Sequence, residues 1–342
     1  MRKTVIAVIL VVLILVSVGI GLEIDRPSTG LVVYTADAYV AESDALMANF
    51  HNATGIAVEP AKGGGSYTLA EEISQGVPAS VFISVALSTY SRSSLGQMYS
   101  GWAIAFAADQ LVLAYANKAN STVEKIVKLF SEANSTENAS QKDAAYRDAF
   151  MNLTAGSVSI GISNASSDPA GLRAYLSLEI AGSLYENNQS FFINRIADNR
   201  GVRTDSNAAE LVSPLISGDL GFLYIYRSAA ISKGLKYIEL PGQLSFGNSS
   251  LSQFYSEFHY NTIAGQQSGA PIYLYASALA NGTEPAASIE FVSYIPGNDS
   301  FLSSYGMRPL KEPLLFNNTQ PPAGIMALIS AGRIVYGGPI PA

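Results

Sequence analysis

Short apolar runs alternate with helix-forming runs between residues 31 and 85, and this alternation constrains the fold more than any other feature. The runs LVVYTA (31–36), IAVEPAKGG (56–64) and ASVFISV (79–85) have the composition of buried strands. Helices are expected between them, near 43–52 and through YTLAEEISQG (67–76). Strands and helices that alternate at this spacing are typical of a mostly parallel sheet covered by helices. The sequence therefore predicts an α/β fold.

Two strong strands divide the rest of the chain. QLVLAYANK (110–118) has no turn signal before it, so we expect it to cross into a second domain, and APIYLYASAL (270–279) is the expected return. This pattern predicts two α/β lobes joined by two crossing strands. The predicted boundaries are an N-terminal segment at 1–22, a linker at 23–30, lobe 1 at 31–113 and 270–315, lobe 2 at 114–269, and a C-terminal tail without clear pattern at 316–342.

The N-terminus carries a membrane signal. Arg2 and Lys3 precede an uncharged run from Thr4 to Leu22. A run of this length can span a bilayer, and the basic flank places the N-terminus in the cytoplasm. Because no small-x-small cleavage site follows, we expect a single uncleaved transmembrane helix in the cell membrane, with the body of the chain extracellular. A removed signal peptide is the alternative.

The composition excludes several classes of protein. The net charge is −7 and no basic block follows the N-terminal pair, so nucleic acid is not an expected partner. The chain has no cysteine and two histidines, which excludes disulfides, thiolate metal sites and multi-histidine metal sites. No spacing of Ser, His and Asp suggests a hydrolytic triad. We expect neither an enzyme nor a resident cofactor.

Sequons for N-glycosylation are frequent. Glycan acceptors need exposed segments of an exported chain, which agrees with an extracellular glycoprotein. A surface rich in Ser and Asn that is never modified is the simpler interpretation. The eleven sequons begin at Asn52, Asn120, Asn134, Asn138, Asn152, Asn164, Asn188, Asn248, Asn281, Asn298 and Asn317.

Several stretches, taken in order, resemble one known family. They include VVYTADAY, GGGSYTLAEEI, SNASSDPAGLRAYL and, most specifically, the segment YRSAA…GLKYIELP. Over roughly residues 31 to 310 the chain resembles the archaeal tungstate/molybdate-binding proteins, which are extracellular receptors of an oxyanion ABC importer. The resemblance implies a periplasmic-binding-protein-like fold whose two lobes close on tungstate or molybdate. It also implies a membrane permease and its ATPase as partners.

The resemblance further implies a binding site, with two departures from the family. Asp37-Ala38 stands where the family has Gly-Ser, and Ala208 stands where the family has Glu. In the family, Asp and Glu carboxylates bind the metal atom of the oxyanion. The resemblance therefore assigns Asp168 to the Mo or W atom and leaves Asp37 or Asp205 as the source of a second carboxylate. The matching positions are Asp37, Ala38, Ser66, Asp168, Pro169, Ala170, Ala208 and Tyr226.

Each of these residues also has a purely structural interpretation. Asp168 before Pro169 fits an ordinary helix N-cap, and Ser66 fits another. Tyr226 ends an apolar strand and fits a core position. Asp37 follows a strand end, where open α/β sheets bind ligands, but a solvated turn residue is the simpler view.

Two further points stay open at this stage. A helix is expected near 207–217, whose start would present backbone N–H groups at Asn207 and Ala208, although Pro214 would kink or shorten it. If loss of the second carboxylate removes metal coordination, the same scaffold would bind sulfate or another small solute. An anchored enzyme or glycan-surface protein is the alternative from a different class.

Overall fold

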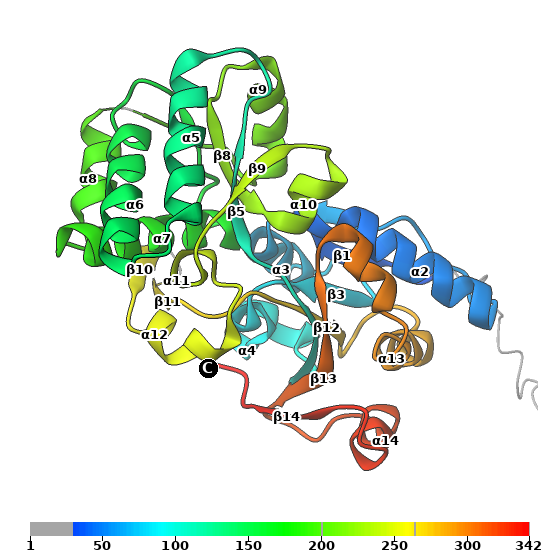
Figure 1. Ribbon diagram of the computed structural model, residues 1–342. Helices are drawn as coiled ribbons and strands as arrows, with labels where there is room; N and C mark the ends of the chain where they lie inside the picture. The colour runs from blue at the N-terminus through cyan, green and yellow to red at the C-terminus, as the bar shows by residue number, and fades with distance from the viewer. Residues whose placement is uncertain (1–29, 200, 263–264, 342) are drawn as a thin grey trace, which may run out of the picture.

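The computed structural model describes residues 30–199, 201–262 and 265–341, and the chain forms two lobes, each built on its own β-sheet (Figure 1). The sheet of lobe 1 has seven strands and that of lobe 2 has five. The anchor expected at 1–22 lies outside the described residues. Within the described ranges, none of the helices combines the length and the apolar character that crossing a membrane requires.

The sheet of lobe 1 is mixed, which corrects the expectation of a mostly parallel sheet. Its strands are β1 (Val33–Ala36), β2 (Lys62–Gly64), β3 (Val81–Ser84), β4 (Trp102–Ala108), β12 (Tyr273–Ala278), β13 (Arg308–Asn317) and β14 (Val335–Gly338), in the order β14-β13-β4-β12-β3-β1-β2. β1 runs parallel to β2 and β3, but β12 runs antiparallel to both β3 and β4. β4 leads toward lobe 2 and β12 returns from it, so these two neighbouring strands run in opposite directions.

Both faces of this sheet are buried, because successive side chains of a strand point to opposite faces. On one face, Val33 and Ile83 belong to the same apolar cluster as Phe50 of α2. On the other face, Val32 and Phe82 cluster with Leu69 of α3, among others. The helical elements of lobe 1 are η1 (Asp37–Tyr39), α2 (Val40–Thr54), α3 (Ser66–Ser74), η2 (Leu87–Tyr90), α4 (Arg92–Leu95), η3 (Gly96–Met98), α13 (Pro285–Tyr294), η6 (Ser300–Tyr305) and α14 (Ala323–Ser330).

The segment 316–342, expected to form a tail, instead completes lobe 1. β13 pairs antiparallel with β4 and parallel with β14, and α14 lies between β13 and β14 in the chain. Pro309 and Pro313 interrupt the strand pattern of β13 in the sequence, because proline cannot donate a ladder hydrogen bond. The structure accommodates them with a register shift between Pro309 and Leu314.

Lobe 2 is built around a second mixed sheet of order β7-β6-β8-β5-β9. Its strands are β5 (Leu111–Tyr115), β6 (Ile160–Gly161), β7 (Val202–Arg203), β8 (Phe222–Tyr226) and β9 (Lys236–Glu239). We expected the crossing within 110–118, but β5 pairs with β8 and β9 along its length. The chain therefore passes between the lobes just before β5, at Asp109 and Gln110.

Helices cover the sheet of lobe 2, and α5, α6 and α8 lie together on one side of it (Figure 1). The helical elements of this lobe are α5 (Ser121–Ser135), α6 (Ala139–Leu153), α7 (Pro169–Glu186), α8 (Phe191–Asp198), η4 (Ala209–Leu211), α9 (Val212–Ser217) and α10 (Arg227–Ser232). α7 is buried on most of its surface, because it packs against β5 and β8 of the sheet and against the neighbouring helices α6 and α8.

The return to lobe 1 is longer than the single crossing strand that we expected at 270–279. It contains α11 (Gly242–Ser245), η5 (Ser249–Leu251), α12 (Ser252–Ser256) and the hairpin β10 (His259–Thr262)–β11 (Gly265–Ser268). Tyr260 of this hairpin stacks on Tyr175 of α7, with ring centroids 4.8 Å apart. The excursion is thus attached to lobe 2 before β12 enters the sheet of lobe 1.

Candidate functional site

Segments from both lobes meet between the two sheets. In lobe 1, Asp37 begins η1 directly after β1, and Ser66 begins α3. In lobe 2, Asp168 precedes α7, Ala208 precedes η4 and Tyr226 ends β8. Strand ends and helix starts therefore position each of these residues, and contacts between the lobes bring them together.

Both carboxylate oxygens of Asp168 accept hydrogen bonds from backbone N–H groups. It caps α7, because Oδ1 accepts a hydrogen bond from the Ala170 N–H at 2.9 Å. Its Oδ2 accepts from the Ala208 N–H at 3.0 Å, and the side chain is 2% exposed. Burial raises the pKa of Asp168, while the Ala170 N–H, the Ser163 hydroxyl and the Ala208 N–H act in the opposite direction.

Asp37 of lobe 1 lies beside Asp168. Its Oδ2 accepts from the Ala209 N–H at 3.0 Å, so the two carboxylates bind successive N–H groups of one segment of lobe 2. Burial and the charge of Asp168 raise the pKa of Asp37 to about 7. Asp205, the other candidate for a second carboxylate, is exposed and bonds the N–H of Ser206.

The start of α3 touches the loop before α7. The Tyr67 N–H donates to the Ser167 carbonyl across the lobes at 3.2 Å. A Cβ added to Gly65 would lie 2.4 Å from that same carbonyl oxygen, so only glycine allows this approach. Ser66 is fully buried, and its hydroxyl has no hydrogen-bond partner within the described part of the chain. The predicted positions Ala38, Pro169 and Ala170 are also buried at these element starts.

Tyr226 is buried and paired with a residue that our sequence analysis did not single out. Its hydroxyl accepts from Nη1 of Arg173 at 2.6 Å, and its ring centroid lies 5.7 Å from that of Tyr39. Arg173 is 6% exposed. The one signal for Arg173 in the sequence is a single basic residue within the apolar helix that follows Asp168.

The segment after Asp205 differs from the expected helix over 207–217. It forms the short helix η4 followed by α9, in which Pro214 is the third residue. Proline is tolerated in a first turn because its missing N–H has no partner there in any case, so Pro214 does not break this element. The N–H of Ala208 does face the candidate site, where Asp168 accepts it.

A buried carboxylate stands where the chain passes between the lobes. Oδ2 of Asp109 accepts from the Tyr39 hydroxyl at 3.0 Å and from the Ser228 hydroxyl at 2.5 Å. Tyr39 lies two residues after Asp37, and Ser228 lies two residues after Tyr226. Asp109 thus connects the passage to candidate site segments of both lobes.

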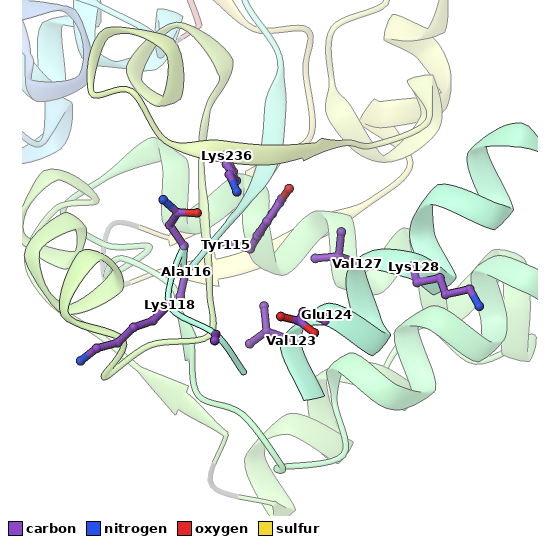
Figure 2. Close-up of a pocket in the computed structure, with 10 residues that line it drawn as sticks. Tyr115, Ala116, Lys118, Val123, Glu124, Val127, Lys128 and Lys236 are labelled. Atoms are coloured by element: carbon purple, nitrogen blue, oxygen red, sulfur yellow. The ribbon is translucent and has the colours of Figure 1, made fainter. Parts of the chain in front are cut away.

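The hollow shown in Figure 2 is a separate feature of lobe 2. It has a volume of about 400 Å³ and is formed by the end of β5, the first turns of α5 and Lys236 of β9. None of the candidate site residues lines this hollow.

Comparison with protein families places the chain among binding proteins. The model of the bacterial extracellular solute-binding proteins matches residues 31–308. An uncharacterized solute-binding protein of Sulfurisphaera tokodaii is 38% identical over 318 residues, which cover 90% of this chain and 83% of the relative. Another, from Saccharolobus solfataricus, is 35% identical over 322 residues, which cover 91% of this chain and 78% of the relative.

Solved structures share the fold. The periplasmic molybdate-binding protein of Azotobacter vinelandii superposes with a TM-score of 0.57 at 18% identity, covering 81% of this chain and 98% of its own. The sulfate-binding protein SubI of Mycobacterium tuberculosis gives 0.54 at 14% identity, covering 91% and 93%. These likenesses confirm the two-lobe α/β fold of periplasmic binding proteins. The family match shows that the chain belongs to the extracellular solute-binding proteins, which serve ABC importers and are not enzymes.

Proposed function

We propose that this protein captures a tetrahedral oxyanion, tungstate or molybdate, between its lobes and delivers it to an ABC permease. One observation carries the proposal. Asp37 of lobe 1 and Asp168 of lobe 2 bind the successive N–H groups of Ala209 and Ala208, so contact between the lobes sets two carboxylates side by side. Asp168 directly precedes α7, and its Cβ lies 3.5 Å from a Cβ built on Gly65, the residue before α3.

The chemistry of the pair fits an oxyanion with a metal centre. The starts of α3 and α7 attract anions through the helix dipole, although the Tyr67 and Ala170 N–H groups there already have acceptors. An ionised carboxylate beside sulfate only repels it, whereas the family resemblance implies that Mo and W accept carboxylate oxygens as ligands. Each carboxylate oxygen has two lone pairs, so Asp168 can bind a metal atom while it accepts its N–H bonds.

The remaining candidate residues have roles consistent with this site. Asp37 would supply the second carboxylate in place of the family's Glu, because it lies beside Asp168 and Asp205 does not. The unpartnered Ser66 hydroxyl would donate to an oxyanion oxygen. Ala208 and Tyr226 would complete the lobe 2 side: the Ala208 N–H holds the Asp168 carboxylate in place, and Tyr226 lies next to Arg173.

Sulfate or another small solute is the second candidate, and two observations favour it. Asp37, whose pKa lies at about 7, can hold a proton and then donate a hydrogen bond to an anion that offers no coordination position. Ala208 in place of Glu points the same way, since it lacks a carboxylate.

Calorimetric titration of the purified protein with tungstate, molybdate and sulfate separates these functions. We expect tungstate and molybdate to bind, and sulfate to bind at least about 10-fold more weakly, because a single charged contact accounts for that much affinity. Tighter binding of sulfate would select the second candidate. Binding of none of the three would show that the oxyanion proposal is wrong.

Gly65→Ala is expected to weaken tungstate binding by about 10-fold or more without unfolding the protein. Gly65 has a φ of −61°, which alanine adopts without strain, so lobe 1 should fold normally. The added Cβ would lie 2.4 Å from the Ser167 carbonyl of lobe 2 and would keep the lobes apart. Gly324→Ala is the control, because its Cβ meets its nearest neighbours at ordinary distances within lobe 1. Equal tungstate affinity in both variants would contradict this role for Gly65.

We also propose that the protein is held by its N-terminal segment at the cell membrane and carries glycans outside it. Every sequon asparagine is exposed or half-buried in the structure, so the chain offers its acceptors to solvent. Mass spectrometry of the protein extracted from membranes tests both points. A mature N-terminus between residues 20 and 30 would exclude the anchor, and an unmodified mass would exclude the glycans.

A further inference from the structure

Arg173 is a buried cation that bonds both lobes at once. It belongs to α7 of lobe 2, and its Nη1 donates to the Tyr226 hydroxyl of the same lobe at 2.6 Å. Its Nη2 donates to the Val85 carbonyl at 2.7 Å, and Val85 directly follows β3 of lobe 1. One guanidinium therefore joins the candidate site of lobe 2 to the sheet of lobe 1.

This link differs from the other contacts around the site. The Tyr67–Ser167 and Ala209–Asp37 hydrogen bonds are longer, at 3.2 and 3.0 Å, and are donated by backbone N–H groups. Both bonds of Arg173 are short and charge-assisted, and such bonds are about twice as strong as neutral ones. The Ala209–Asp37 bond is also charge-assisted when Asp37 is ionised, but it is a single bond. A buried guanidinium must find acceptors, because a charge removed from water without partners is strongly unfavourable. When the lobes separate, Arg173 loses the Val85 carbonyl as an acceptor and its guanidinium returns to water.

Arg173 also acts on the candidate ligand residue Asp168. Its charge favours the ionised form of that carboxylate and so lowers the pKa of Asp168 against the effect of burial. The Tyr67 side chain of lobe 1 lies close enough to sense the same charge. When the lobes meet, the positive charge of Arg173 therefore lies near Asp168, Asp37 and the incoming anion. It offsets part of the negative charge that these groups bring together.

We propose that Arg173 is the positioning residue that holds the two lobes together around the oxyanion, through its fork between Tyr226 and Val85. The inference rests on the proposed function, since tungstate is the probe. Arg173 is not assigned a contact with the anion: it acts through the lobes and through Asp168.

The proposal predicts which rate constant changes in Arg173→Lys. Lysine keeps the positive charge, but its single ammonium group cannot reproduce the planar fork that reaches two acceptors. The lobes should separate more often, so the dissociation rate constant of tungstate should rise about 10- to 100-fold, the range for loss of a hydrogen bond to a charged group. The association rate constant should change little, because the anion enters while the lobes are apart. Arg195→Lys is the matched control, since Arg195 bonds the Met151 carbonyl within lobe 2.

The absence of cysteine makes closure directly measurable. Gln97→Cys in lobe 1 and Ala144→Cys in lobe 2 place spin labels at exposed positions on opposite lobes. Double electron–electron resonance then gives the distribution of distances between the two spin labels, with and without tungstate. We expect tungstate to narrow this distribution in the parent protein and in the Arg195→Lys control, and to leave it broad in Arg173→Lys.

Each outcome decides the proposal. The proposal is wrong if tungstate narrows the distance distribution of Arg173→Lys as much as that of the parent protein and if this variant releases tungstate at the parent's rate. A lower association rate constant with closure intact would also overturn it, because Arg173 would then act in anion capture. If the parent binds no oxyanion, the proposed function fails on its own. The role of Arg173 is then tested by the distance distributions measured without ligand. Arg173 holds the lobes together only if this distribution is broader in Arg173→Lys than in Arg195→Lys.

Discussion

Asp168→Asn is expected to weaken tungstate binding by roughly 10- to 100-fold, the range for loss of a charged contact in a closed site. Asparagine caps helices about as well as aspartate, so its Oδ1 should keep the bond to the Ala170 N–H. The amide lacks the charge of a carboxylate and is a poorer ligand for a Mo or W atom. Calorimetric titration measures the loss.

The ligand-free protein should barely change its melting temperature. The amide nitrogen that replaces Oδ2 in this variant would face the Ala208 N–H, and that hydrogen bond would be lost. Removing the charge beside Asp37 acts in the opposite direction, because two adjacent buried carboxylates destabilise each other. We expect the melting temperature to stay within about 2 °C, which corresponds to roughly 1 kcal/mol for a chain of this length. Asp205→Asn is the control, since that carboxylate is exposed and should leave tungstate binding unchanged.

The same variant separates the two candidate solutes. If the natural solute is sulfate, Asp168 can only repel it unless protonated, and Asp168→Asn should tighten sulfate binding. If tungstate affinity does not change, Asp168 is a helix cap and a partner of Ala208, and takes no part in coordination.

Local features of the site could be predicted from the sequence. Asp168 followed by Pro169 specifies an N-cap and the first helical residue, and the structure places both at the start of α7. The buried strands near 31–36 and 79–85 are likewise visible in short runs of apolar residues, and they appear as β1 and β3. In each case the determining contacts lie within a few residues.

Contacts between distant residues could not be predicted in this way. Arg173 bonds Tyr226 and Val85, which lie 53 and 88 residues away in the chain. The bond between Asp37 and the Ala209 N–H spans 172 residues. No periodicity encodes such pairs, because they exist only when the lobes meet. The same holds for β13, whose place next to β4 depends on pairing with a strand far earlier in the chain.

The second large effect that we expect is a change in the pH dependence of stability in Asp37→Asn. Burial and the neighbouring Asp168 raise the pKa of Asp37 from 3.8 to about 7. Above pH 7 the carboxyl is ionised in the folded and the unfolded chain, and the folded state bears the full cost of the buried charge. Between pH 7 and pH 3.8 the folded state takes up a proton that the unfolded chain does not, so this cost shrinks as the pH falls.

Two charged groups act on the pKa of Asp37, and a third carboxyl, Glu42, titrates in the same pH range. Asp168 raises the pKa of Asp37 and Lys233 lowers it. Glu42, in the first turn of α2, is fully buried, both of its carboxylate oxygens lack partners within the described residues, and burial raises its pKa to about 7 as well. Glu42→Gln therefore serves as the companion variant, because it removes the second group that titrates in the same window.

Asparagine at position 37 keeps an acceptor for the Ala209 N–H and removes the charge. A shift of about three pKa units corresponds to at most about 4 kcal/mol, so Asp37→Asn should be more stable than the parent protein at pH 8 by roughly 1–4 kcal/mol. This difference should fall toward zero near pH 4. Urea denaturation of both proteins from pH 8 to pH 5 measures it, and taking the difference cancels groups common to both, including Glu42. A difference that stays constant with pH would mean that Asp37 titrates as an ordinary surface carboxylate, and the two carboxylates would then not be coupled across the lobes.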